Sequence, residues 1–239
     1  MMSTKNTKDS TLSKYFLPYD IYERHKFVGS LIENGQTVVD IGGELNLLSQ
    51  FCRPAEIIVA NLTSGDIIIK KNKIPFKKKS FDVVTSIDVL EHLPKTKRKD
   101  FISRLLEIAK KRLILSFPIG TPKHIAYEKK SQNLLKKMGV DVRYLKEHIL
   151  YGLPTTSEIV EYSRDFNTKI YYSGNINVNK LLFNLFIFDP KVKFLRKCIY
   201  FSKLFFNLIT NPIWYRLLTF KKYSDSVNRA YMVIEKSNP

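Results

Sequence analysis

Short apolar runs rich in β-branched residues recur along the first half of the chain. The run at residues 37–41 (TVVDI) ends in Gly42-Gly43 and is typical of a buried parallel strand that enters a tight turn. Similar runs predict three more strands, at residues 56–60, 66–69 and 81–87. A helix is predicted over residues 20–33, because its apolar residues recur about every 3.6 positions and Asn34-Gly35 follows as a stop signal.

The apolar pattern then alternates between the helical and the strand period. Helical spacing covers residues 97–111, and a strand at residues 112–117 follows and is closed by Pro118. We also expect a short helix at 45–51, helices near 125–138 and at 155–163, a loop at 151–154, and strands at 168–172 and 230–235. Thr155 or Thr156 caps the helix at 155–163, with Glu158 in capping-box position. This alternation predicts an α/β fold, a parallel sheet with helices on both faces.

Residues 179–220 form a basic, aromatic segment that differs from the rest of the chain. Residues 180–222 contain nine Lys or Arg and one Asp. Lys203 interrupts one apolar run and Asp189-Pro190 ends another, so no run reaches the roughly 18 apolar residues of a membrane-spanning helix. We expect a helical insertion that acts as a lid on the sheet. A basic amphipathic segment also suits peripheral contact with an anionic membrane, which we keep as an addition.

Composition indicates one domain in a reducing compartment. With 239 residues, 44% of them hydrophobic, the chain can fill one sizeable α/β core. Its two cysteines, Cys52 and Cys198, lie far apart without CxxC spacing, so we expect neither a disulfide framework nor a metal site. Residues 1–13 are polar and lack the apolar run of a secretory signal. We therefore expect a flexible tail over 1–13, a single domain over 14–239 and a cytoplasmic location.

The formal net charge of +18 favours an anionic partner, either nucleic acid or an acidic membrane surface. However, the chain has 30 lysines and only 10 arginines, and Arg is the residue preferred for bidentate phosphate recognition. Abundant Lys, Asn and Ile can also reflect a biased coding sequence. The charge thus supports a functional interpretation and a compositional one about equally.

The turn after the first strand is the first candidate for a ligand site. Open α/β sheets bind ligands at the carboxyl ends of their strands, and here that end reads Asp40-Ile41-Gly42-Gly43-Glu44. Glycines at such a turn let a ligand approach the backbone. Asp40 can accept hydrogen bonds or hold a cationic group. Taken alone, the same turn is equally explained as a tight connection.

Four further motifs follow the glycine turn in one order: Ile74-Pro75-Phe76, SFDVV at residues 80–84, DVLEHLP at 88–94 and LILSFP at 113–118. Over about residues 20–163 this run resembles class I S-adenosylmethionine-dependent methyltransferases of the methyltransferase-11 type. The resemblance implies a Rossmann-like, seven-stranded, mostly parallel sheet with helices on both faces. Its last two strands would form an antiparallel edge, with residues 179–220 inserted before the last strand.

The resemblance also implies a cofactor site for S-adenosylmethionine, which leaves as S-adenosylhomocysteine. Asp40, Gly42 and Gly43 correspond to the loop around the methionine part of the cofactor. Asn61 stands where the family usually has an acidic residue for the ribose hydroxyls. The rim where cofactor and acceptor meet corresponds to Asp88, Glu91 and His92. The chain departs from the family pattern at Glu44 and Asn46, where glycine is frequent, and at Asn61. A binding or scaffold protein that kept the fold without the cofactor therefore stays as an alternative.

The acceptor is only partly constrained by the sequence. The sulfonium is an activated methyl donor, so the enzyme must align the acceptor and remove its proton, for which we expect His148 first, then Glu147 and His124. An ordinary loop histidine is the alternative for His148, as helix capping is for His92. Without an Asp/Asn-Pro-Pro-Tyr sequence, nucleic-acid base methylation is disfavoured. We expect O- or N-methylation of a small-molecule, sugar or lipid-linked acceptor. An RNA-associated methyltransferase is a third hypothesis, suggested by lysine-rich clusters at residues 70–71, 77–79 and 95–99.

Overall fold

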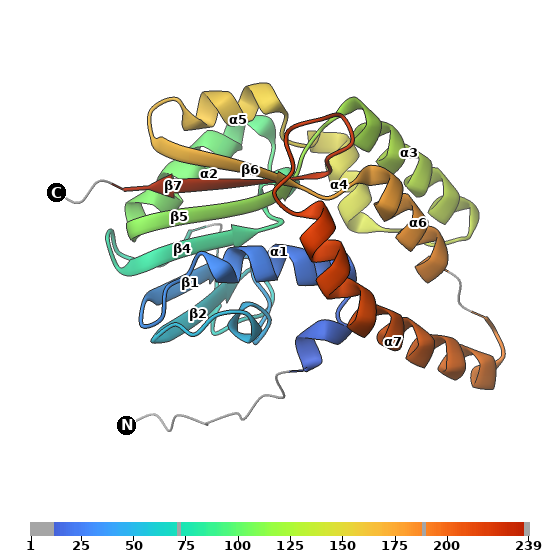
Figure 1. Ribbon diagram of the computed structural model, residues 1–239. Coiled ribbons are helices and arrows are strands. Elements are labelled where there is room, and N and C mark those ends of the chain that lie inside the picture. Colours follow the sequence, from blue (N-terminus) through green and yellow to red (C-terminus); the bar gives the residue numbers. More distant parts are fainter. Residues whose placement is uncertain (1–11, 71–72, 188–189, 237–239) are drawn as a thin grey trace.

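The computed structural model describes residues 12–70, 73–187 and 190–236. Its centre is a seven-stranded sheet with the order β3-β2-β1-β4-β5-β7-β6 (Figure 1). The strands are β1 (Thr37–Ile41), β2 (Glu56–Asn61), β3 (Ile67–Ile68), β4 (Phe81–Ile87), β5 (Ala109–Pro118), β6 (Asn167–Ser173) and β7 (Arg229–Glu235). Strands β1 to β5 are parallel, whereas β7 lies antiparallel between β5 and β6. The expected Rossmann-like sheet with its antiparallel last pair is confirmed.

Helices cover both faces of this sheet. The α-helices are α1 (Tyr19–Ser30), α2 (Lys95–Ile108), α3 (Pro122–Lys137), α4 (Arg143–Tyr151), α5 (Thr156–Ser163), α6 (Ile176–Ile187) and α7 (Lys193–Leu218). On one face, α2 and α5 bury apolar side chains such as Leu105 and Ile159 against Val84 and Leu115. On the other face, Phe27 and Val28 of α1 pack with strand residues of a second cluster. Burial of these two apolar layers provides the main stabilisation of the domain.

A third group of helices lies beyond the carboxyl ends of the parallel strands (Figure 1). Helices α3, α4 and α6 gather there, and the long α7 runs from this group past α1. The amino-terminal 3₁₀ helix η1 (Ser13–Phe16) packs on α7. Residues 1–11 of the expected tail lie outside the described residues, but Ser13 belongs to η1, so the boundary at residue 13 is wrong by at least one residue.

The expected insertion is helical but begins earlier than predicted. It comprises α6 and α7, and α6 starts at Ile176 rather than at residue 179. Among the described residues, no helix combines the length and the apolarity needed to cross a membrane.

Two local expectations are wrong, and one helix was missed. Residues 45–51 form only the 3₁₀ turn η2 (Leu48–Gln50), because the chain turns back at Phe51, which packs tightly on Gly29 of α1. Residues 109–111 are the start of β5, since α2 ends at Ile108 and Ala109 is already extended. Helix α4 was not expected at all. In contrast, Thr155 and Glu158 form the predicted capping box.

Candidate functional site

The two glycines after β1 are required by their surroundings. Gly42 has φ of 85°, a conformation that favours glycine, and a Cβ there would lie 2.2 Å from Cγ2 of Val89. A Cβ on Gly43 would lie 1.9 Å from Oδ2 of Asp40. The glycine turn therefore packs directly on the segment that follows β4, which connects it to the Asp88–His92 region.

Asp40 is a buried carboxyl at the carboxyl end of β1. Its Oδ1 accepts a hydrogen bond from the Thr85 hydroxyl at 2.8 Å, whereas Oδ2 is buried without a hydrogen-bond partner among the described residues. Burial raises the pKa of Asp40 to about 6, and the Thr85 bond only partly opposes this. Asp40 thus keeps one acceptor oxygen uncommitted next to the glycine turn.

Asn61 supports the glycine turn from β2. Its Nδ2 donates to the carbonyl oxygens of Gly42 at 3.2 Å and Gly43 at 2.9 Å, while its Oδ1 accepts from the Leu62 N–H at 2.6 Å. The structure therefore shows this amide bound to the loop, which holds the turn in place.

The remainder of the turn shows how the departures from the glycine-rich pattern are accommodated. Asn46 has φ of 60°, a left-handed conformation that Asn tolerates better than most residues, and the side chain of Glu44 is exposed. Within the described part of the chain, the N–H groups of Gly43, Glu44 and Leu45 have no backbone acceptor. Free N–H groups of this kind can bind a carboxylate or another anion.

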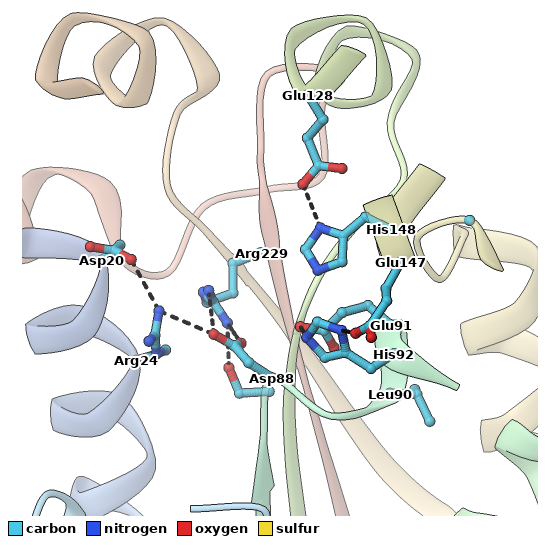
Figure 2. Close-up of polar contacts among 12 residues, drawn as sticks. Asp20, Arg24, Asp88, Leu90, Glu91, His92, Glu128, Glu147, His148 and Arg229 are labelled. Atoms are coloured by element: carbon cyan, nitrogen blue, oxygen red, sulfur yellow. Dashed lines mark hydrogen bonds and ion pairs between the residues drawn. The ribbon is translucent and has the colours of Figure 1, made fainter. Parts of the chain in front are cut away.

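Asp88 at the end of β4 anchors a buried network of charges. Its carboxylate contacts the guanidinium of Arg229 from β7 and lies 3.1 Å from Arg24 of α1 (Figure 2). Arg229 also donates to the Ser116 hydroxyl at 3.0 Å and lies 3.9 Å from Glu23. Burial opposes ionisation of Asp88, but the two arginines outweigh it and hold its pKa below the usual range. Asp88 is therefore ionised at neutral pH.

The second cluster lies beside this network and contains most of the predicted rim and catalytic residues. The 3₁₀ turn η3 (Leu90–His92) positions Glu91 and His92, and α4 positions Glu147 and His148. Nδ1 of His92 lies 2.7 Å from Oε2 of Glu147, and the centroids of the two imidazole rings are 5.0 Å apart. His148 belongs to a helix and is buried, so its interpretation as a loop histidine is wrong, and His92 does not cap α2.

Glu128 connects the remaining histidine to this cluster. Its Oε1 lies 2.8 Å from Nδ1 of His148 and 3.7 Å from Nε2 of His124. His124 is also bound through Nδ1 to the carbonyl oxygen of Ile119 at 2.8 Å, and burial lowers its pKa. Glu128 was not predicted from the sequence, although its position four residues after His124 on one helix was a local signal.

A cavity of about 520 Å³ joins the charge network and the histidine cluster. Helix α1 contributes Asp20 and Arg24, β7 contributes Arg229, and the insertion contributes Phe183, Phe186 and Asn207. The other polar lining residues include Asp88, Glu91, His92, His124, Glu128 and His148. The cavity has aromatic and charged walls, and α6 contributes Phe183 and Phe186 to them. Arg229 and Arg24 were not predicted from the sequence, because they come from elements at opposite ends of the chain.

Comparisons with known proteins agree with the fold. Residues 37–115 match the sequence model of a family described as a methyltransferase domain. A Thermotoga maritima structure described as a SAM-dependent methyltransferase has a TM-score of 0.54 at 13% identity, with 94% of this chain and 92% of that chain covered. An Archaeoglobus fulgidus SAM-dependent methyltransferase has a TM-score of 0.53 at 14% identity, with coverage of 93% and 96%.

A third similar structure is a Haemonchus contortus phosphoethanolamine N-methyltransferase in complex with S-adenosylmethionine. Its TM-score is 0.51 at 14% identity, and 97% of this chain and 58% of that chain are covered. At such identities these structures establish the fold alone. No curated protein matches the chain.

The sheet, the glycine turn and the family match together define a class I S-adenosylmethionine-dependent methyltransferase. Within that class, residues 37–115 match the family model described as a methyltransferase domain. The match ends at residue 115, so α3, α4, α6 and α7, which line most of the cavity, lie outside the part shared with the family.

Proposed function

We propose that the protein methylates a hydroxyl or amine of a small-molecule, sugar or lipid-linked acceptor that binds in the cavity next to His92 and His148. The observation that carries this proposal is the contact between the glycine turn and the cavity. Gly42 packs on Val89, and the neighbouring residues Asp88 and Glu91 line the cavity. A cofactor at the glycine turn and an acceptor in the cavity would therefore both contact the segment from Asp88 to Glu91.

The glycine turn suits the methionine part of the cofactor. Its free N–H groups provide donors for a carboxylate, and the unpartnered oxygen of buried Asp40 provides an acceptor next to them. Asn61 acts in this proposal by holding the loop through Gly42 and Gly43 rather than by reaching the ribose. When bound, the cofactor supplies an activated methyl group on a sulfonium. What the protein contributes is alignment of the acceptor and exclusion of water.

The part of the cavity lined by His92 and His148 would receive the reacting heteroatom of the acceptor. His148 is bound through Nδ1 to Glu128, and its Nε2 is buried without a partner among the described residues. A histidine that is oriented in this way can take a proton from a hydroxyl or ammonium group. This arrangement supports the predicted role of His148 as the proton acceptor. His124 and Glu147 would contribute to the polar surroundings of this histidine.

The first experiment is calorimetric titration of the protein with S-adenosylmethionine and S-adenosylhomocysteine. We expect micromolar binding, about −8 kcal/mol, that is lost in Asp40→Ala and retained in Asp100→Ala, an exposed aspartate of α2. Circular dichroism verifies that both variants fold. Absence of binding in the folded wild-type protein would contradict the enzyme proposal and support the cofactor-free alternative.

The exposed side of α7 favours a lipid-linked acceptor and a membrane contact. Phe194, Phe201, Phe205, Ile209 and Ile213 are all more than half exposed and follow each other at helical spacing. In contrast, Asn207 and Asn211 on the same helix are buried. A surface helix usually buries its apolar residues and exposes its polar ones, whereas α7 does the reverse along this stripe. The apolar stripe is therefore a candidate interaction surface.

Charge indicates which surface would cover this stripe. The segment from Lys191 to Lys222 is strongly basic, as is the whole chain with its charge of +18. An apolar stripe flanked by lysines fits the headgroup region of an anionic membrane. We propose that α7 lies on such a membrane and brings the cavity near a lipid-linked acceptor.

Vesicle sedimentation tests this second part of the proposal. We expect the protein to bind vesicles that contain phosphatidylserine and not neutral phosphatidylcholine vesicles. The double variant Phe201→Ser, Phe205→Ser should lose most of this binding. Val160→Ser, which changes a similarly exposed apolar residue of α5, should retain it. Equal sedimentation of the double variant and the wild type would exclude the stripe as the contact.

A further inference from the structure

Three side chains at the cavity wall converge on a common centre. Glu91 and His92 come from η3, and His148 comes from α4. Each offers one ligand atom, and these atoms all lie within 4.8 Å of one another. Figure 2 shows the two rings and the Glu91 carboxylate turned toward the same space.

Both histidines are held by carboxylates through the same ring nitrogen. Nδ1 of His92 is bound to Glu147 at 2.7 Å, and Nδ1 of His148 is bound to Glu128 at 2.8 Å. A carboxylate accepts hydrogen bonds, so the bound Nδ1 carries the hydrogen and each neutral ring presents Nε2 as a lone pair. Carboxylate–histidine pairs of this kind orient the histidines of metal sites.

Two atoms at the centre are buried without hydrogen-bond partners among the described residues. They are Oε2 of Glu91, in a side chain that is 1% exposed, and Nε2 of His148, in a side chain that is 7% exposed. Leaving such atoms unsatisfied is unfavourable, because they have lost water without gaining another partner. A cation at this position would satisfy both atoms.

We propose that Glu91, His92 and His148 bind a divalent transition-metal ion at the wall of the acceptor cavity. Two imidazoles and one carboxylate form a ligand set that suits Zn²⁺, Fe²⁺, Co²⁺ or Mn²⁺ and leaves coordination positions open. All three residues line the cavity, so the open positions face the acceptor. The sequence did not indicate this site, because its ligands are separated along the chain and include no cysteine.

The metal site deepens the proposed function and rests on it for the identity of the reaction. A hydroxyl that binds a divalent ion has a lowered pKa and releases its proton to solvent more easily. Its oxygen then forms a bond to the methyl carbon, and the carbon–sulfur bond breaks with its electron pair remaining on sulfur. The products are a methyl ether and S-adenosylhomocysteine. With the metal bound, Nε2 of His148 acts as a ligand and the metal ion replaces it as the group that activates the hydroxyl.

Cobalt(II) titration tests the site without reference to activity. The full-length protein, free of any histidine tag and treated with chelator, is titrated with CoCl₂ while visible absorption is recorded. We expect one ion per chain, and competition by ZnCl₂. His92→Ala and His148→Ala should each weaken binding at least 100-fold, whereas His25→Asn, which changes a buried histidine of α1, should bind as the wild type does.

Glu147→Gln provides a second variant in case the buried ligands are needed for folding. Glu147 is partly exposed, and its replacement should weaken cobalt binding about 10-fold to 100-fold through loss of the carboxylate partner of His92. Titration of the same samples with S-adenosylhomocysteine reports the cofactor site independently. Folded protein that binds S-adenosylhomocysteine but no cobalt would overturn the metal site alone, as would cobalt binding that both histidine variants retain.

Discussion

Arg229 and Asp88 form a buried ion pair although 141 residues separate them in the sequence. Asp88 directly follows the parallel strand β4, and Arg229 begins the antiparallel strand β7. Because β7 runs opposite to its neighbour β5, its first residue lies at the edge of the sheet where the parallel strands end. The last strand thereby places a cation at the ligand edge, where it neutralises Asp88 and lies near Glu23.

Removal of the Arg229 side chain should strongly destabilise the protein. Arg229→Met leaves the carboxylates of Asp88 and Glu23 buried without their main cation, which typically costs about 3–5 kcal/mol. Urea denaturation measures the free energy of unfolding. Lys78→Ala, which breaks the exposed pair with Glu107, is the control and should cost less than about 1 kcal/mol. A similar decrease in the free energy of unfolding in both variants would show that the buried pair stabilises the protein no more than the exposed pair does.

The raised pKa of Asp40 predicts a specific dependence of stability on pH. Its pKa rises from 3.8 in a free side chain to about 6 in the folded protein, so the folded state binds the proton more tightly. The resulting stabilisation is fully present below the unfolded pKa and is lost as pH rises through the folded one. It amounts to ~3 kcal/mol at most. The difference in unfolding free energy between Asp40→Asn and wild type should therefore shift in favour of the variant between about pH 4 and about pH 6, the two pKa values of Asp40.

Urea denaturation over this pH range measures the difference, and other titrating groups cancel because both proteins contain them. Asp100→Asn, at an exposed position of α2, should give a curve parallel to that of the wild type. A curve for Asp40→Asn that is also parallel would show that Asp40 titrates normally.

Arg98 fixes the segment that holds Glu91 and His92. It is fully buried and donates to the carbonyl oxygens of Leu90 and Leu93, to Glu158 at 2.9 Å, and to the carbonyl oxygen of Gly152. Lysine cannot reproduce this set of bonds because it lacks the planar fork of donors. Arg98→Lys should cost about 2–4 kcal/mol in urea denaturation.

The matched control is Arg104→Lys, an exposed position on the same helix, which should change stability by less than about 0.5 kcal/mol. Tolerance of lysine at position 98 would contradict the bracing role. The burial of Arg98 also bears on the RNA hypothesis, because one of the charges in the 95–99 cluster is already bound within the protein.

Most of the sheet was predictable from the sequence, since buried parallel strands are short apolar runs bounded by turns. The errors fall where local signals were ambiguous. Ala109 continues the apolar spacing of α2, yet it pairs with Phe81 in the sheet. Helix α4 has only nine residues and its N-cap, Val142, makes no side-chain cap bond. A start signal for this helix was therefore missing from the sequence.

The candidate site was predictable as a set of residues but not as an arrangement. The family resemblance indicated His92, and the need for a base indicated His148. Only the tertiary structure brings α4 onto η3 and places Glu147 at His92, 55 residues away. The same applies to Arg229, which no local pattern distinguishes from a surface arginine. Local spacing predicts periodic elements, whereas contacts between distant elements depend on how those elements pack.

Asn211 should anchor the amino-terminal turn to α7. It is fully buried, and its Nδ2 donates to the carbonyl oxygens of Tyr15 at 2.9 Å and Leu17 at 2.8 Å. Asn211→Ala leaves both carbonyl groups without this donor and should cost about 2 kcal/mol of stability. It should also increase hydrogen exchange in η1 more than in β4, because η1 depends on this contact. Thr210→Ala, where the hydroxyl only donates to Phe206 of the same helix, is the control. Unchanged exchange in η1 of Asn211→Ala would show that other contacts hold the turn on α7.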